Sequence, residues 1–275
     1  MVDIHSHIVP GVDDGAVSLE MSLAMIEVAK QCGVTSILTT PHIRGEAGDA
    51  MMHEMHKKAF QPLLDAKPDM DLYLGGEVRV TPETHGITNH PEFTADEKSK
   101  YILLEMEFDK VPPYFTQLLF DFRLQGITPI VAHPERNAGV LKNPEHALEF
   151  VRQGAILQVT NGALLGEFGE TIQSCALQLF ECGLAGILAS DAHNLTSRPF
   201  TNWPEVYEYA LELEKRGNSI LPLTADDLCT NHPSAVCQGT PIAPIELDER
   251  AIGQIQKRLF KNSTPAVKRK RFFFL

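Results

Sequence analysis

The stretch Val2-Asp3-Ile4-His5-Ser6-His7 opens the chain as a short apolar strand that ends in two histidines. Residues i and i+2 of an extended segment point to the same side, so both imidazoles can reach one point just beyond the strand. Such a pair can hold a metal ion, although many His-x-His pairs are solvated loop residues. The pattern of the remaining chain decides between these two interpretations.

Apolar, β-rich runs recur along the chain, with helical patterns between them. After residues 2–4 the runs occupy 34–39, 72–74, 101–104, 127–132, 155–160 and 186–189, and helices are expected at 19–32, 50–66, 114–125, 144–153, 169–182, 203–215 and 247–259. Ser18 is the predicted N-cap of the first helix. The alternation is typical of a parallel sheet or barrel with helices outside. The stretch between the last two helices, which includes Asn231-His232-Pro233, Pro241 and Pro244, is expected to be loop-like and to pack across the barrel.

Composition places the chain among enzyme-sized globular proteins. Its 275 residues, 43% hydrophobic and 22% charged, suffice for one large α/β domain, which we assign to residues 1–262. The formal net charge of -12 argues against a broad basic face that binds nucleic acid. No apolar run approaches the ~20 residues that span a bilayer, and no basic and apolar leader precedes Val2, so we expect a cytoplasmic protein.

The end of the chain has a different character. Residues 263–275 form a basic-aromatic tail, in which residues 268–275 place four cations before four apolar residues. This tail is either frayed and solvated or makes a weak contact with an anionic membrane surface or an acidic partner.

Three sets of side chains outside the strand ends have simple interpretations. The five cysteines are odd in number and form no CxxC, which favours reduced thiols. Cys175 and Cys182 lie seven residues apart in a helical pattern and are expected in the core. His53 and His56 are three apart on a predicted helix, and we interpret them as exposed residues rather than ligands.

Ionisable side chains follow the ends of the predicted strands, and in a parallel barrel these ends share the face where active sites are built. The candidate metal ligands are His5, His7, Asp14, His42, Glu77, Glu105, His133, Asp191 and His193. Each has a simpler alternative, because a carboxylate can cap a helix and a histidine can satisfy a carbonyl. Together they favour a metal cluster, since unpaired buried carboxylates repel one another and buried imidazoles lose hydration.

The donor types indicate which ions the cluster would hold and what they would do. Five imidazoles and four carboxylates without a thiolate suit manganese, iron, zinc or cobalt better than calcium or magnesium. With bridging carboxylates, this set can hold two or three ions. Adjacent ions lower the pKa of a shared water and supply a nucleophile at neutral pH, so the sequence predicts a hydrolase.

Two arginines suggest what is hydrolysed. Arg136 and Arg198 follow the fifth and seventh predicted strands in loops at the same face. A guanidinium offers paired donors to phosphate oxygens and stabilises charge during phosphoryl transfer, which predicts a phosphate ester as substrate. The alternative for each arginine is a salt bridge with Glu135 or another acid at the rim. Arg44 and Arg79 are weaker candidates for the same role.

The ordered motifs resemble those of the PHP (polymerase and histidinol phosphatase) superfamily. They are His5-Ser6-His7, Thr40-Pro41-His42, Gly76-Glu77, Leu104-Glu105, His133-Pro134-Glu135-Arg136 and Ser190-Asp191-Ala192-His193. More narrowly, residues 9–15, 131–137 and 190–194 resemble the bacterial manganese-dependent tyrosine phosphatases of capsule and exopolysaccharide operons. The resemblance implies a distorted (β/α)7 barrel with C-terminal helices, in which the nine candidate ligands hold two or three Mn2+ ions and both arginines bind phosphate.

The resemblance also implies a substrate, namely phosphotyrosines on the tail of a bacterial tyrosine kinase, and a role in regulating polysaccharide synthesis. A metal-linked water or His42 would protonate the leaving phenolate. One alternative is a phosphoesterase of the same superfamily that acts on histidinol phosphate or a similar small metabolite. Another is a non-catalytic regulator that binds phosphorylated tails through its metals and arginines, which the complete ligand set disfavours. The short acidic chain disfavours a polymerase-associated nuclease.

Overall fold

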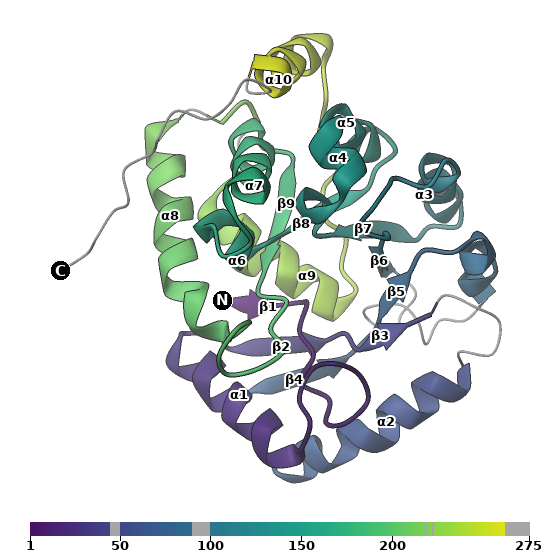
Figure 1. The fold of residues 1–275 in the computed structure, drawn as a ribbon, viewed down its shortest axis with the longest axis vertical. Coiled ribbons are helices and arrows are strands. Elements are labelled where there is room, and N and C mark those ends of the chain that lie inside the picture. Colours follow the sequence, from purple (N-terminus) through teal and green to yellow (C-terminus); the bar gives the residue numbers. More distant parts are fainter. Residues whose placement is uncertain (45–49, 90–99, 218, 222, 262–275) are drawn as a thin grey trace.

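The strands of this computed structural model, which describes residues 1–44, 50–89, 100–217, 219–221 and 223–261, all pair in parallel (Figure 1). They form a three-stranded sheet of order β1-β2-β4 and a six-stranded sheet of order β3-β5-β6-β7-β8-β9. The bounds are β1 Val2–Asp3, β2 Ser36–Thr39, β3 His42–Ile43, β4 Asp71–Leu74, β5 Glu77–Arg79, β6 Tyr101–Glu105, β7 Thr128–Ala132, β8 Ile156–Thr160 and β9 Ala185–Ala189.

Two of the seven predicted runs, residues 34–39 and 72–74, form β2 and β4, and each is followed by a further short strand, β3 or β5, that lies in the other sheet. β2 pairs with β4, whereas the continuations β3 and β5 pair with each other in the larger sheet. Gly76, just before β5, lies so close to β3 that an added Cβ would approach Ile43 Cδ1 to 2.1 Å. A larger residue at this position would therefore force the buried Ile43 side chain to move. With these two additional strands, the described residues form nine strands where seven runs were predicted, and the breaks between β2 and β3 and between β4 and β5 distort the barrel.

Backbone contacts join the last strand to the first. Ser6 and Ala192 form a parallel bridge beyond the ends of β1 and β9. The His7 N–H donates to the Ala192 carbonyl at 2.8 Å, and the Asp191 N–H donates to the His5 carbonyl at 2.8 Å. The first and last motifs of the chain are thereby held side by side.

The strands are buried on both faces, as expected of a parallel sheet covered by helices. Tyr101 and Leu103 of β6 belong to a cluster inside the barrel, whereas Ile102 and Leu104 pack into the larger core between strands and helices. This division follows the two-residue period of a strand. Val236 and Cys237 of the segment before the last helix complete the inner cluster, which confirms that this segment packs across the barrel.

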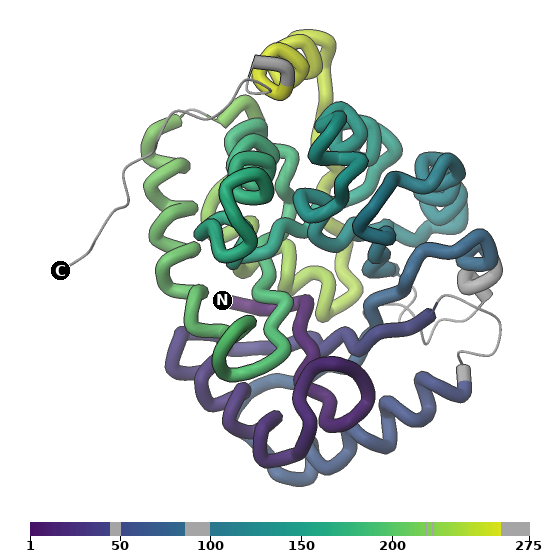
Figure 2. Tube along the Cα trace, viewed as in Figure 1, coloured from purple at the N-terminus to yellow at the C-terminus, as the bar shows by residue number. Residues whose placement is uncertain are grey.

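Helices cover the outside of both sheets, with α1 and α2 along the smaller sheet and most of the others around the larger one (Figures 1 and 2). Their bounds are α1 Leu19–Gln31, α2 Ala50–Asp65, α3 Phe115–Leu124, α4 Ala138–Lys142, α5 Glu145–Arg152, α6 Asn161–Leu165, α7 Glu170–Cys182, α8 Trp203–Arg216, α9 His232–Gln238 and α10 Glu249–Lys261. All seven predicted helices are present. Ser18 caps α1 as predicted, since its hydroxyl accepts from the Met21 N–H at 3.3 Å.

Two predictions are wrong. The loop-like stretch is partly helical, because a π-helical turn at Asp227–Asn231 leads directly into α9, and Pro233 lies in the first turn, where a missing N–H costs nothing. His53 and His56 are buried rather than exposed; the exposed face of α2 carries Met51 and Met55 instead. Spacing alone places two residues on one helix face without showing which way that face points.

Cys175 and Cys182 are buried in the core, as predicted, and burial raises the pKa of each thiol to about 12. The predicted tail at residues 263–275, including the proposed membrane-contacting residues 268–275, lies outside the described residues. Among the described residues, no helix combines the length and apolar character needed to cross a bilayer.

Candidate metal centre

The structure brings all nine candidate ligands together, although His42 and Glu77, expected just after a strand, are themselves the first residues of β3 and β5. Their donor atoms form four overlapping groups, within each of which the atoms lie no more than 4.8 Å apart. The groups are His5, Glu77 and His133; His5, His7 and Asp191; His42, Glu77 and Glu105; and His7, Asp14, His42 and His193. Residues from both sheets contribute, so the distorted barrel is what assembles the site. Neither His53 nor His56 belongs to these groups, which were sought among the described residues.

Hydrogen bonds at Nδ1 orient three of the imidazoles. His5 Nδ1 lies 2.8 Å from Gln158 Oε1, His7 Nδ1 lies 2.7 Å from Asp13 Oδ2, and His193 Nδ1 lies 2.9 Å from the Asp191 carbonyl oxygen. These amide, carboxylate and carbonyl oxygens accept hydrogen bonds, so in the neutral ring Nδ1 carries the hydrogen and Nε2 presents a lone pair. Outer partners of this kind fix the tautomer of metal-binding histidines.

The Nε2 atoms, which carry these lone pairs, face carboxylate oxygens and one another. His5 Nε2 lies 3.2 Å from Glu77 Oε1 and 3.4 Å from Asp191 Oδ1, and it is 3.4 Å from His7 Nε2. Both imidazoles are fully buried. Neutral nitrogens and ionised oxygens at these distances repel one another unless protons or cations lie between them. The donor set therefore fits divalent ions.

The ionisation of the site follows from the same contacts. Burial opposes the charged form of His7, yet its bonds to Asp13, Asp191 and Glu77 raise its pKa well above the usual value. Burial likewise opposes ionisation of Glu77, but the neighbouring His5 and the hydrogen bonds from other imidazoles hold its pKa well below the usual range. Without a cation, His7 thus retains a proton that a metal must displace.

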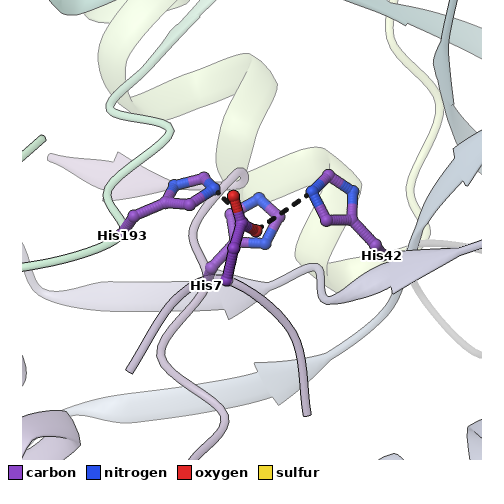
Figure 3. A group of neighbouring side chains, drawn as sticks. His7, His42 and His193 are labelled. Carbon is purple, nitrogen blue, oxygen red and sulfur yellow. Dashed lines mark ion pairs between the residues drawn. The ribbon is translucent and has the colours of Figure 1, made fainter. Parts of the chain in front are cut away.

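The cluster has a buried part and an open edge. The Asp14 side chain is 65% exposed and the His42 side chain 35%, whereas His5 is buried completely. Asp14 Oδ1 lies 3.3 Å from His42 Nε2 and 3.4 Å from His193 Nε2. Figure 3 shows His7, His42 and His193 arranged around these two ion pairs. A substrate would approach the cluster from this edge.

Arg136 and Arg198 both reach the cluster through Asp191. Arg136 Nη1 donates to Asp191 Oδ2 at 2.7 Å, and Arg198 Nη2 donates to the same oxygen. A salt bridge was the simpler alternative for each arginine, but its partner is Asp191, because Glu135 is buried and accepts from the Thr160 N–H at 2.9 Å. Arg198 Nε is buried with no hydrogen-bond partner among the described residues. Each guanidinium has five N–H donors, so both keep donors for an anion; phosphate binding stays a prediction.

The weaker arginine candidates lie beside β3 and β5. Arg79 Nη2 is 3.4 Å from Glu105 Oε2, and Arg44 is exposed just after β3. Arg79 is therefore tied to a candidate ligand in the way that Arg136 is. Among the residues that the structure describes, no comparable ion pair positions Arg44.

Two of the three described non-glycine residues with positive φ are candidate ligands, and the third is Lys67, outside the site. His133 and Asp191 have φ of 31° and 53°, in the left-handed region that costs a non-glycine residue about 1–2 kcal/mol. Gly15 lies so close to His7 that an added Cβ would come within 2.1 Å of the His7 carbonyl oxygen. The fold thus holds ligand-bearing turns in conformations that sequence alone does not favour.

Sequence reasoning missed Asp3, a fully buried carboxylate that fixes both ligand-bearing ends of the barrel. Its Oδ1 accepts from the His5 N–H at 2.9 Å, and its Oδ2 accepts from the Ser190 N–H at 3.1 Å and from Trp203 Nε1 at 2.7 Å. Burial raises its pKa, although these bonds act in the opposite direction. A charged residue inside an otherwise apolar strand was the available signal.

Asp13 and Gln158 were also missed. Asp13 accepts from His7, from the Gly15 N–H at 2.9 Å and from the His42 N–H at 3.2 Å. Burial would raise its pKa, but the hydrogen bond and charge of His7 lower it to about 2. Asp13 was overlooked because its neighbour Asp14 was chosen as the candidate ligand of this loop. For Gln158, the available signal was a glutamine in a buried strand.

A parallel α/β barrel with imidazoles and carboxylates gathered at its strand ends defines the class of metal-dependent hydrolases. Within that class, the family described as "Capsular polysaccharide synthesis, CpsB/CapC" matches residues 1–228, and the chain belongs to this family. The resemblance drawn from the motifs is thereby confirmed.

Relatives and a solved structure agree with the family. The chain is 36% identical over 227 residues to "Tyrosine-protein phosphatase YwqE" of Bacillus subtilis (strain 168), covering 81% of this chain and 87% of the relative. It is 30% identical over 207 residues to "Tyrosine-protein phosphatase CpsB" of Streptococcus pneumoniae, covering 72% and 85%. The chain also resembles a solved structure from the report "Crystal structures of YwqE from Bacillus subtilis and CpsB from Streptococcus pneumoniae, unique metal-dependent tyrosine phosphatases". The two superpose with a TM-score of 0.75 at 32% sequence identity, and the match covers 90% of this chain and 100% of the solved chain. The predicted barrel fold is confirmed.

Proposed function

We propose that this chain is a metal-dependent protein-tyrosine phosphatase of capsular or extracellular polysaccharide synthesis, and that it acts on phosphotyrosines in the tail of a bacterial tyrosine kinase. The observation that carries the proposal is the convergence of nine imidazole and carboxylate ligands with two arginines at one face of the barrel. Family membership and the names of its relatives support the activity. The kinase tail rests on the motif resemblance.

The nine candidate ligands would hold two or three ions, for which Mn2+ is our first choice and iron, zinc or cobalt the alternatives. The fit rests on the buried Nε2 lone pairs and carboxylates that face one another. When bound, such ions lower the pKa of water and neutralise charge on phosphoryl oxygens.

The chain's own residues bind and orient the phosphate ester. Arg136 and Arg198 donate to the phosphoryl oxygens, and Asp191 holds both guanidinium groups beside the cluster. His42 lies at the open edge, where it can donate a proton to the leaving phenolate oxygen; a water is the alternative donor. Because a phenol has a pKa of about 10, the phenolate leaves with modest help, and the proton donor matters less to the rate than the metal ions do.

The exposure of Asp14 and His42 at the open edge of the cluster favours a protein substrate over a small metabolite. Asp14 and His42 lie partly in solvent, so a phosphotyrosine side chain on a flexible tail can reach them. Histidinol phosphate or a similar metabolite would gain more from an enclosed pocket that buries the whole ligand.

The test compares phosphate release from a phosphotyrosine peptide, a phosphoserine peptide and histidinol phosphate by metal-stripped protein, with and without added manganese. Manganese-dependent release that is fastest on phosphotyrosine is expected. Preference for histidinol phosphate would reassign the substrate and leave the metal centre in place. No release from any substrate, with metals bound, would favour the binding regulator.

A further inference from the structure

The exposed ring of Phe108 lies beside the candidate metal centre. Phe108 follows β6 and the candidate ligand Glu105, and it is 45% exposed. Its ring stacks on His133, with centroids 5.7 Å apart and an interplanar angle of 23°. The guanidinium carbon of Arg136 lies 4.8 Å from the centroid of the same ring. Phe108 therefore borders both a candidate metal ligand and a candidate phosphate-binding side chain.

The segment that carries Phe108 is held by hydrogen bonds from residues at the start of α4. Asn137 Nδ2 donates to the carbonyls of Glu107 at 2.6 Å and Lys110 at 2.8 Å. The Ala138 N–H donates to the Phe108 carbonyl at 2.7 Å. An exposed aromatic ring on a backbone held from both sides is preorganised for contact, so it loses little entropy when a ligand packs against it.

We propose that Phe108 is the surface against which the phenol ring of the substrate packs, and that it makes the site selective for aryl phosphate esters. This inference rests on the proposed function. A single oxygen joins the phosphate of phosphotyrosine to its ring, so a surface that binds the ring must border the phosphate site. Aromatic rings pair in offset or edge-to-face arrangements that stabilise them beyond simple burial. Phosphoserine has no ring and gains nothing from this contact.

A second role for Phe108 has to be separated from this one, because the ring also contacts Arg136. Arg136 lies 4.9 Å from the centroid of the Phe168 ring and keeps its 2.7 Å bond to Asp191. These two contacts remain when the Phe108 ring is removed. A loss of phosphate binding would reveal an effect through Arg136, whereas a loss confined to aryl esters would reveal ring packing.

The experiment uses the manganese-loaded full chain and two probes. KM and kcat are measured for a phosphotyrosine peptide, and the inhibition constant is measured for inorganic phosphate, which has no ring. Phe108→Leu is expected to raise KM for the peptide by about 2- to 12-fold, the range of an aromatic pair, and to leave kcat and the phosphate inhibition constant unchanged. Phe108→Trp should restore the wild-type KM.

The matched control is Phe120→Leu, because Phe120 is 44% exposed but lies on α3. This variant should keep the wild-type KM. An unchanged KM in Phe108→Leu would overturn the inference, and so would a parallel rise in the phosphate inhibition constant. If wild-type protein released no phosphate from the peptide, the proposed function would fail first, and the inference with it.

Discussion

Asp13→Asn is expected to weaken metal binding while leaving every candidate ligand in place. Asp13 accepts from His7 Nδ1 at 2.7 Å, and its two oxygens also accept from the backbone N–H groups of Gly15 and His42. Each Asp13 oxygen accepts from at least one N–H group. An asparagine at this position would therefore turn its own NH2 group toward one of these donors and lose that hydrogen bond. The substitution also removes the negative charge that increases the basicity of His7.

The size of the effect follows from what Asp13 does. Loss of an outer partner of a metal-binding histidine reduces metal affinity or activity by about 10- to 100-fold. That range corresponds to about 1.4–2.7 kcal/mol of binding free energy. The higher end applies here, since the lost bond is short and charge-assisted.

Manganese is titrated into metal-stripped wild type and variant, and both bound metal and phosphate release from a phosphotyrosine peptide are followed. The midpoint of the manganese titration should move to a higher manganese concentration for Asp13→Asn. Phosphate release should largely recover once the variant is saturated with manganese. Asp69→Asn is the control, because Asp69 is exposed and pairs with Lys30 at 2.6 Å on the surface. An unchanged midpoint in Asp13→Asn would refute the role of Asp13.

Three further predictions concern ligands, packing and protons. His133→Ala should lower turnover by orders of magnitude with the circular dichroism spectrum unchanged, and near-wild-type activity would remove His133 from the site. Gly15→Ala should lower the free energy of unfolding in urea by at least about 1–3 kcal/mol, because its Cβ would overlap the His7 carbonyl; equal stability would contradict the close approach. Manganese binding should release protons and weaken as pH falls, since neighbouring carboxylates outweigh burial and raise the pKa values of His5 and His7. Calorimetry in buffers of different ionisation enthalpy measures this release, and no buffer dependence would refute it.

The barrel and the set of candidate ligands could be predicted from sequence because both depend on local patterns. A buried parallel strand is a short apolar run, and a residue at its carboxyl end must lie at one face of the barrel. His133, for example, could be placed from the run before it. The breaks between β2 and β3 and between β4 and β5 left no such pattern, since they arise from pairing between segments that are distant in the chain.

Outer partners and burial were harder to predict for a physical reason. Asp3 and Asp13 act through hydrogen bonds to residues brought close by the fold, and nothing in their spacing shows this. His53 was predicted to be exposed, but which face of a helix is buried depends on its neighbours. The helical spacing of α9 was obscured because its proline and its polar residues are also typical of loops.

The most direct test of the metal centre is a crystal structure of the manganese-soaked protein, with anomalous scattering recorded above the manganese absorption edge. Two or three anomalous peaks are expected among the four ligand groups, each in contact with His5, His7, Glu77 or Asp191. Peaks elsewhere, or none among these groups in crystals of protein that binds manganese in solution, would contradict the assignment of these residues as a metal centre.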